Sequence, residues 1–197
     1  MLNTIKPTEQ HILIGLGIWG STVAIAGSLN WFTLLPLPSL SILVVVSLAM
    51  LLLLYYTIPA IYTYLASLNP RHLILFHLWR IGAGITFLYY GSQALLPRQF
   101  VINAGYGDLA VGLLVPLILI GQPSLQKYLV FHLLGQIDFA IAVGTGLTFT
   151  VLQVPLMENI ATFPIVLIPL FGVPVTGASS IVAIDTLLKH RRELLHR

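Results

Sequence analysis

The sequence predicts an all-α integral membrane protein: a bundle of six transmembrane helices with both termini in the cytoplasm. Hydrophobic residues make up 57% of the 197 residues and charged residues only 8%, and the mean hydropathy is +0.96. An ordinary soluble domain carries about 25% charged residues, so this surface is expected to face lipid. Six apolar segments are long enough to cross a bilayer, and the basic residues gather on one side of them.

A helix needs about 20 predominantly apolar residues to cross the hydrocarbon core. The second apolar segment is longer than this and contains Pro59, which predicts a kink or an extension into the headgroup region. The fourth begins at Ala104 or as early as Pro97, because proline suits the first turn of a helix. The chain, 1–197, is thus predicted to form one transmembrane domain. Its six expected spans are residues 12–29, 40–66, 72–95, 104–120, 125–150 and 164–188.

The loop charges predict the orientation of the bundle. If the N-terminus is cytoplasmic, seven basic residues fall on the cytoplasmic side and only Arg98 falls outside. Bacterial inner-membrane proteins carry this positive-inside bias. Four basic residues lie in a tail at 189–197, which is expected to bind anionic lipid headgroups rather than nucleic acid. The seven cytoplasmic residues are Lys6, Arg71, Lys127, Lys189, Arg191, Arg192 and Arg197.

Ionisable residues inside the spans are the candidate functional residues, because a charge in lipid needs a partner or a water-filled cavity. Arg80 lies about 12 Å into the third span, and Asp138 about 19 Å into the fifth, measured from the same side at about 1.5 Å per residue. An arginine side chain can reach across that difference in depth. Arg80 and Asp138 are therefore predicted partners, either as an ion pair that fixes helix register or as a transport site.

Asp108 is the third candidate, and its depth depends on where the fourth helix begins. If the helix begins at Pro97, Asp108 lies near the midplane and can join Arg80. If it begins near Ala104, Asp108 lies in the first turn, where the helix dipole favours a negative charge. The sequence leaves both possibilities open.

Two histidines inside the spans suggest a cofactor site. His77 and His132 lie at similar depth on the third and fifth spans, so they are candidate axial ligands of a b-type haem. The alternative is that both are hydrogen-bonded inside the bundle. Asp138 lies about 120° from His132 around the helix, so one rotation of the helix cannot aim both at the same point. No cofactor and no metal site is otherwise expected.

The last span contains Pro164, Pro169 and Pro174, followed by the stretch TGASS. Prolines at this density break the helical hydrogen-bond ladder, and the freed carbonyls must then face protein or water. Broken helices form the midplane sites of many transporters. The alternative is a simple kink in which Ser179 or Ser180 bonds to its own backbone.

Four stretches carry a resemblance to a known group: WRIGAGITFL, LPRQFVINAGYGDLAVG, LLGQIDFAIAVGTGL and FPIVLIPLFGVPV. An aromatic–Arg pair, an A-G-x-G-D stretch and an L-G-x-x-D stretch together resemble a set of small, uncharacterised bacterial multi-pass membrane proteins. The likeness covers roughly residues 72–175. It implies the same layout and points to Arg80, Asp108 and Asp138, but it does not call for His77 or His132 and implies no activity.

Three functions follow as expectations. The first is a permease for small solutes, or a proton-linked one, that uses Arg80, Asp138 and Asp108. The second is a non-catalytic scaffold or assembly subunit with a membrane-protein partner, or a homo-oligomer. The third is a haem protein using His77 and His132. An enzyme is not expected, because the sequence has no cysteine, no HExxH motif and no phosphate loop.

Overall fold

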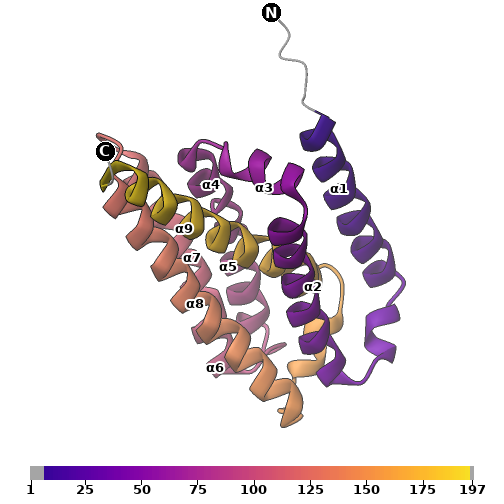
Figure 1. The fold of residues 1–197 in the computed structure, drawn as a ribbon. Helices are drawn as coiled ribbons and strands as arrows, with labels where there is room; N and C mark the ends of the chain where they lie inside the picture. Colours follow the sequence, from indigo (N-terminus) through magenta and orange to yellow (C-terminus); the bar gives the residue numbers. More distant parts are fainter. Residues whose placement is uncertain (1–6, 196–197) are drawn as a thin grey trace, which may run out of the picture.

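The computed structural model is an all-α bundle (Figure 1); it describes residues 7–195, with side chains through Lys189. Within this range no strand is formed, and six helical segments are long and apolar enough to cross a membrane. This confirms the predicted fold class. The predicted basic tail lies, beyond Lys189, outside the described side chains. The six segments are Pro7–Ser28, Leu37–Thr57, Pro70–Ser92, Arg98–Leu119, Leu125–Val151 and Ile168–Lys189.

The segments run up and down. The beginning of α1 (Pro7–Ser28), the connection between α3 (Pro59–Ala66) and α4 (Pro70–Phe76), and the end of α9 (Val173–Leu195) all lie at one end of the bundle (Figure 1). This arrangement has the even number of crossings that the loop charges predict. Short 3₁₀ helices, η1 (Trp31–Leu34) and η3 (Met157–Ala161), lie in the connections at the other end.

The second apolar segment is two helices rather than one span over 40–66. α2 (Leu37–Thr57) ends just before Pro59, which is the first residue of α3. Proline has no backbone N–H and its ring excludes the preceding helical carbonyl, so the helix stops there and a new one starts. Of these two helices, only α2 is long enough to cross a membrane.

Three of the six segments depart from regular α-helix. The third divides into α4 and α5 (Trp79–Ser92) at a turn over residues 77–78. The fourth contains the π-helix η2 (Val101–Tyr106) between α6 (Arg98–Phe100) and α7 (Gly107–Leu119), and the sixth begins with the π-helix η4 (Ile168–Gly172). π-Helical turns occur frequently at functional sites, so a functional site is expected near these irregular turns.

The fourth helix begins earlier than residue 104. Pro97 is its N-cap and α6 starts at Arg98, so Asp108 lies a full ten residues into the helical segment rather than in its first turn. At about 1.5 Å per residue this places Asp108 roughly 15 Å from the helix start, near the middle of a span. The sixth segment begins later than predicted, since residues 163–166 form a turn, Leu167 is the N-cap and the helix begins at Ile168.

Glycines let α5 and the η2–α7 segment approach almost backbone to backbone. A Cβ atom on Gly84 would lie 2.7 Å from the carbonyl oxygen of Gly105 and 2.8 Å from the amide nitrogen of Leu109. A Cβ atom on Gly112 would lie 2.6 Å from Cγ1 of Ile81. Such small faces are how helices pack closely in membranes, and here they bring the polar residues of both segments together.

Candidate functional site

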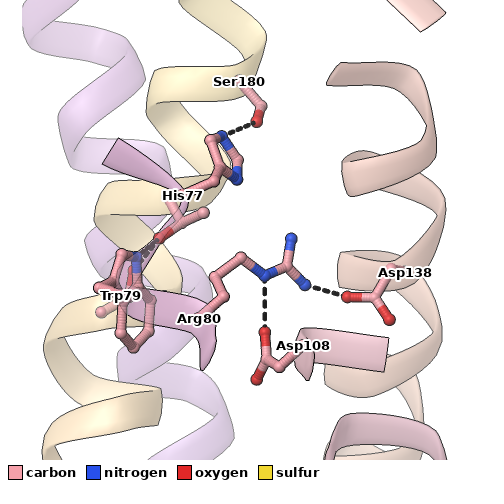
Figure 2. A network of polar contacts seen from close by, with 8 residues as sticks. His77, Trp79, Arg80, Asp108, Asp138 and Ser180 are labelled. Atoms are coloured by element: carbon pink, nitrogen blue, oxygen red, sulfur yellow. Dashed lines mark hydrogen bonds and ion pairs between the residues drawn. The ribbon is translucent and has the colours of Figure 1, made fainter. Parts of the chain in front are cut away.

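Arg80 is the centre of a buried charged cluster, and only 4% of the residue is exposed. Its Nε donates a hydrogen bond to Oδ1 of Asp108 at 2.7 Å, and its Nη2 pairs with Oδ2 of Asp138 (Figure 2). The three residues come from α5, α7 and α8 (Leu125–Val151). We call Arg80, Asp108 and Asp138 the charged triad. The sequence predicted either carboxylate as a partner of Arg80, and the structure brings both together.

Local irregularities position each member of the triad. Arg80 is in the first turn of α5, where its backbone N–H bonds to the carbonyl of His77 in a tightened turn. Asp108 follows directly after the π-helix η2. The carboxylate of Asp138 lies directly over Gly107, so close that a Cβ at that position would overlap its Oδ1. Glycine at 107 is therefore a steric requirement of the Asp138 contact.

The triad holds more negative than positive charge. One guanidinium faces two carboxylates whose side chains are only 10% and 13% exposed. With both carboxylates ionised, the formal charge is −1, and an excess charge in a low-dielectric environment is costly. The arrangement therefore favours one further cation, either a proton on a carboxylate or a positively charged solute.

A cavity of about 80 Å³ lies beside the triad and is lined in part by Arg80 and Asp108. The Nη1 atom of Arg80 has no protein partner among the residues that the structure describes. At about 30 Å³ for each water molecule, a cavity of this size has room for roughly two to three waters. The rest of the wall is mostly aliphatic, and it also includes aromatic, amide and hydroxyl side chains, among them Trp79, Phe87, Phe100, Phe139, Gln136 and Thr176.

A second buried polar cluster joins the two histidines through a serine. Ser180 Oγ lies 3.1 Å from Nε2 of His77 (Figure 2) and 3.3 Å from Nδ1 of His132. Both imidazoles are fully buried, and their ring centroids are 5.4 Å apart. The similar depth read from the sequence thus corresponds to a close approach in the structure. We call His77, Ser180 and His132 the histidine–serine cluster.

The two histidines are arranged differently from a pair of haem ligands. Bis-histidine haem places the imidazoles on opposite faces of a porphyrin, whereas these two nitrogens share one serine hydroxyl. The residues present do not fit a haem between them. Within the described residues there is also no group of three or more His, Asp or Glu side chains that could hold a metal ion.

Trp79 and Ser180 are site residues that the sequence indicated only as part of the aromatic–Arg pair and as a possible kink serine. The indole Nε1 of Trp79 donates to Oγ1 of Thr176 at 2.9 Å, and the ring packs directly on Gly172. This contact fastens the start of α5 to the start of α9. Of the two serines in TGASS, Ser179 bonds to the backbone carbonyl of Thr176 as a simple kink predicts, whereas Ser180 bonds to the histidines.

In a comparison with protein-family models, residues 37–188 match a Domain of unknown function (DUF8737). The match covers more than half of the chain. The chain belongs to this family. The family's region includes the whole charged triad and the histidine–serine cluster, whereas α1 lies outside it. No curated protein and no solved structure matches the chain.

Proposed function

We propose that this protein is a proton-linked permease for a small solute, in which the charged triad is the site where proton and solute compete. The observation that carries the proposal is a buried arginine bridging two carboxylates at a cavity among interrupted helices. Intramembrane charges of this kind mark ion or substrate pathways, and interrupted helices supply the midplane sites of secondary transporters.

The charge of the triad favours a cation as the solute. In one state, a proton on Asp138 or Asp108 brings the formal charge of the triad to zero. In the other state, a monovalent cation in the cavity does the same after the carboxyl has released its proton. Because either cation balances the triad, binding of one displaces the other, which is the condition for exchange. Aromatic walls formed by Trp79, Phe87 and Phe139 suit an organic cation, since ring faces attract positive charge.

The size of the cavity limits the solute. A volume of about 80 Å³ is that of about two to three water molecules. A small quaternary or protonated amine fits this range, whereas a sugar or a nucleotide does not. As part of this proposal, the lysine and arginine bias supports a location in a bacterial inner membrane with cytoplasmic termini.

Two alternatives remain as competing proposals. A scaffold or assembly subunit would use the triad only to fix helix register, as buried polar groups do in some proteins. Its signature is co-purification of a stoichiometric membrane partner, with no solute flux. A haem protein would give a Soret band in protein from haem-replete cells, and the shared hydroxyl of Ser180 argues against that arrangement.

Reconstituted vesicles with an imposed pH gradient provide the test. We would measure uptake of tetramethylammonium, glycerol and acetate as cationic, neutral and anionic probes. Uptake of the cation alone is expected, with loss of uptake in Asp138→Asn and Arg80→Gln. Asp185→Asn is the matched control, because that carboxylate pairs with Lys189 and accepts a hydrogen bond from Tyr55, outside the triad. Equal behaviour of all probes, or a parent-like Asp138→Asn with intact folding, would contradict the proposal.

A further inference from the structure

Three buried polar atoms lack a hydrogen-bond partner in the described part of the chain: Nδ1 of His77, Nε2 of His132 and the Tyr128 hydroxyl. Buried polar atoms are nearly always hydrogen-bonded, so each exception calls for an explanation. All three belong to or adjoin the histidine–serine cluster. Tyr128 lies one turn before His132 on α8, on the same face of the helix.

The two unpartnered nitrogens are the two ends of a hydrogen-bonded row. The row runs from Nδ1 of His77 through its ring to Nε2, across Ser180 Oγ, then to Nδ1 of His132 and through that ring to Nε2. Imidazole and hydroxyl groups both donate and accept hydrogen bonds, so every member of the row can take a proton on one side and release one on the other.

Ser180 of the row and Arg80 and Asp108 of the triad line the same cavity, and Gly135 lies close to both groups. A Cβ atom on Gly135 would lie 3.7 Å from Nη1 of Arg80 and 3.8 Å from Cε1 of His77, the carbon next to the unpartnered Nδ1. Arg80, Gly135 and Ser180 all line the cavity. The space beside Gly135 therefore adjoins both groups, and a water molecule there would link the guanidinium to the histidine.

We infer that the histidine–serine cluster is a proton relay that connects the charged triad to the end of the bundle where α8 begins. The inference rests on the proposed function and names the route of its proton. Around the row, the ionisable groups are Arg80 on α5, Asp108 on α7, and Tyr128 and Asp138 on α8. The facing part of α9 contributes the hydroxyls of Thr176 and Ser180.

The transfer balances without any other reactant. A proton from a triad carboxyl passes through water and forms an N–H bond at Nδ1 of His77. His77 gives its Nε2 proton to Ser180, and Ser180 gives its hydroxyl proton to Nδ1 of His132. His132 then releases its Nε2 proton to water on the side of Tyr128, because neither this nitrogen nor the Tyr128 hydroxyl has a protein partner in the described part of the chain. One proton enters and one leaves, both rings end neutral in the other tautomer, and rotation of the hydroxyl and exchange of the tautomers reset the row.

Gly135→Ala tests the relay with little steric disturbance, because the added methyl makes only ordinary van der Waals contacts. It fills the space where water would join the triad to His77. Gly144→Ala is the control, since a methyl at that position of the same helix meets nothing within 4 Å. Ser180→Ala interrupts the row, and Ser179→Ala beside it removes a hydroxyl that bonds only to backbone.

In vesicles, uptake driven by a pH gradient should fall at least about tenfold in Gly135→Ala and Ser180→Ala, since positioned proton-transfer groups contribute roughly 10²–10⁴-fold. Exchange of labelled for unlabelled tetramethylammonium, which moves no net proton, should persist. Both activities should be unchanged in Gly144→Ala and Ser179→Ala. Loss of exchange together with driven uptake, or retention of both, would overturn the relay.

A second measurement does not depend on transport. In ¹⁵N-histidine-labelled protein in nanodiscs, magnetisation should pass from water to the His77 ring N–H in the parent and in Gly144→Ala, but not in Gly135→Ala. The His77 signal is assigned by its loss in His77→Asn. If the parent moves no solute, the proposed function fails while this experiment still tests the relay. A His77 ring without water contact in the parent, or with equal contact in Gly135→Ala, would overturn it.

Discussion

Removing Arg80 should destabilise the protein far more than removing either carboxylate charge. Arg80→Gln leaves Asp108 and Asp138 facing each other with 10% and 13% of their side chains exposed and no cation between them. Leaving a buried charge without its partner costs about 3–5 kcal/mol. At about 2–4 °C per kcal/mol for a chain of this size, the melting temperature should fall by roughly 6–20 °C.

Asp138→Asn should have a much smaller effect. The amide keeps an oxygen that accepts from Nη2 of Arg80, and the remaining Arg80–Asp108 pair is formally neutral. The expected loss is that of weakening one hydrogen bond, about 1 kcal/mol, or roughly 2–4 °C. Asn at 138 also resembles the protonated carboxyl that the exchange model places in the triad.

Thermal unfolding of the purified variants in one detergent measures the difference, with Asp185→Asn as a control for removing a carboxylate outside the triad. Equal losses of melting temperature in Arg80→Gln and Asp138→Asn would refute the reasoning. Asn at 138 would then be a poor replacement for Asp138, as it would be if both carboxylates of the triad were ionised. Parent-like stability of all variants would also refute it, because the charges would then be solvated without their partners.

Further predictions concern packing and the contacts that hold the site. Gly84→Ala should lower stability by about 1–3 kcal/mol, because its Cβ would lie 2.7 Å from a backbone oxygen, whereas Gly144→Ala should not lower it; chemical denaturation of both variants compares them. Thr176→Val should cost about 1 kcal/mol by removing the bond to Trp79, and Trp79→Phe should cost more because it also removes the ring atoms packed on Gly172; in a mutant cycle the double variant should lose less than the sum of the two single variants. Gly107→Ala should displace the Asp138 carboxylate and abolish cation uptake in vesicles while Gly144→Ala retains it.

The sequence predicted the fold class and much of the charged cluster. Six apolar segments and one-sided loop charges are strong signals, and helix rise alone placed Arg80 and Asp138 at compatible depth. The same calculation placed His77 and His132 at similar depth in the third and fifth spans. These predictions succeeded because depth in a span follows directly from residue number once the span is found.

Other features of the site could not be decided from the sequence. The role of Asp108 depended on helical structure that starts at Arg98 and continues through a π-helix, and hydropathy does not distinguish α from π turns. The turn at residues 77–78 contains neither proline nor glycine. Ser180 was ambiguous because a hydroxyl in a membrane helix can bond either to its own backbone or to another helix, and only the packing decides.

The most direct test of the central claim is to record proton and solute movement together. Vesicles that contain a pH-sensitive dye and no imposed gradient would receive tetramethylammonium outside. The account predicts that entry of the cation drives protons out and makes the interior alkaline, in the parent and in Asp185→Asn but not in Asp138→Asn. Cation entry without a change in internal pH, or an equal change in Asp138→Asn, would contradict a triad in which proton and solute compete.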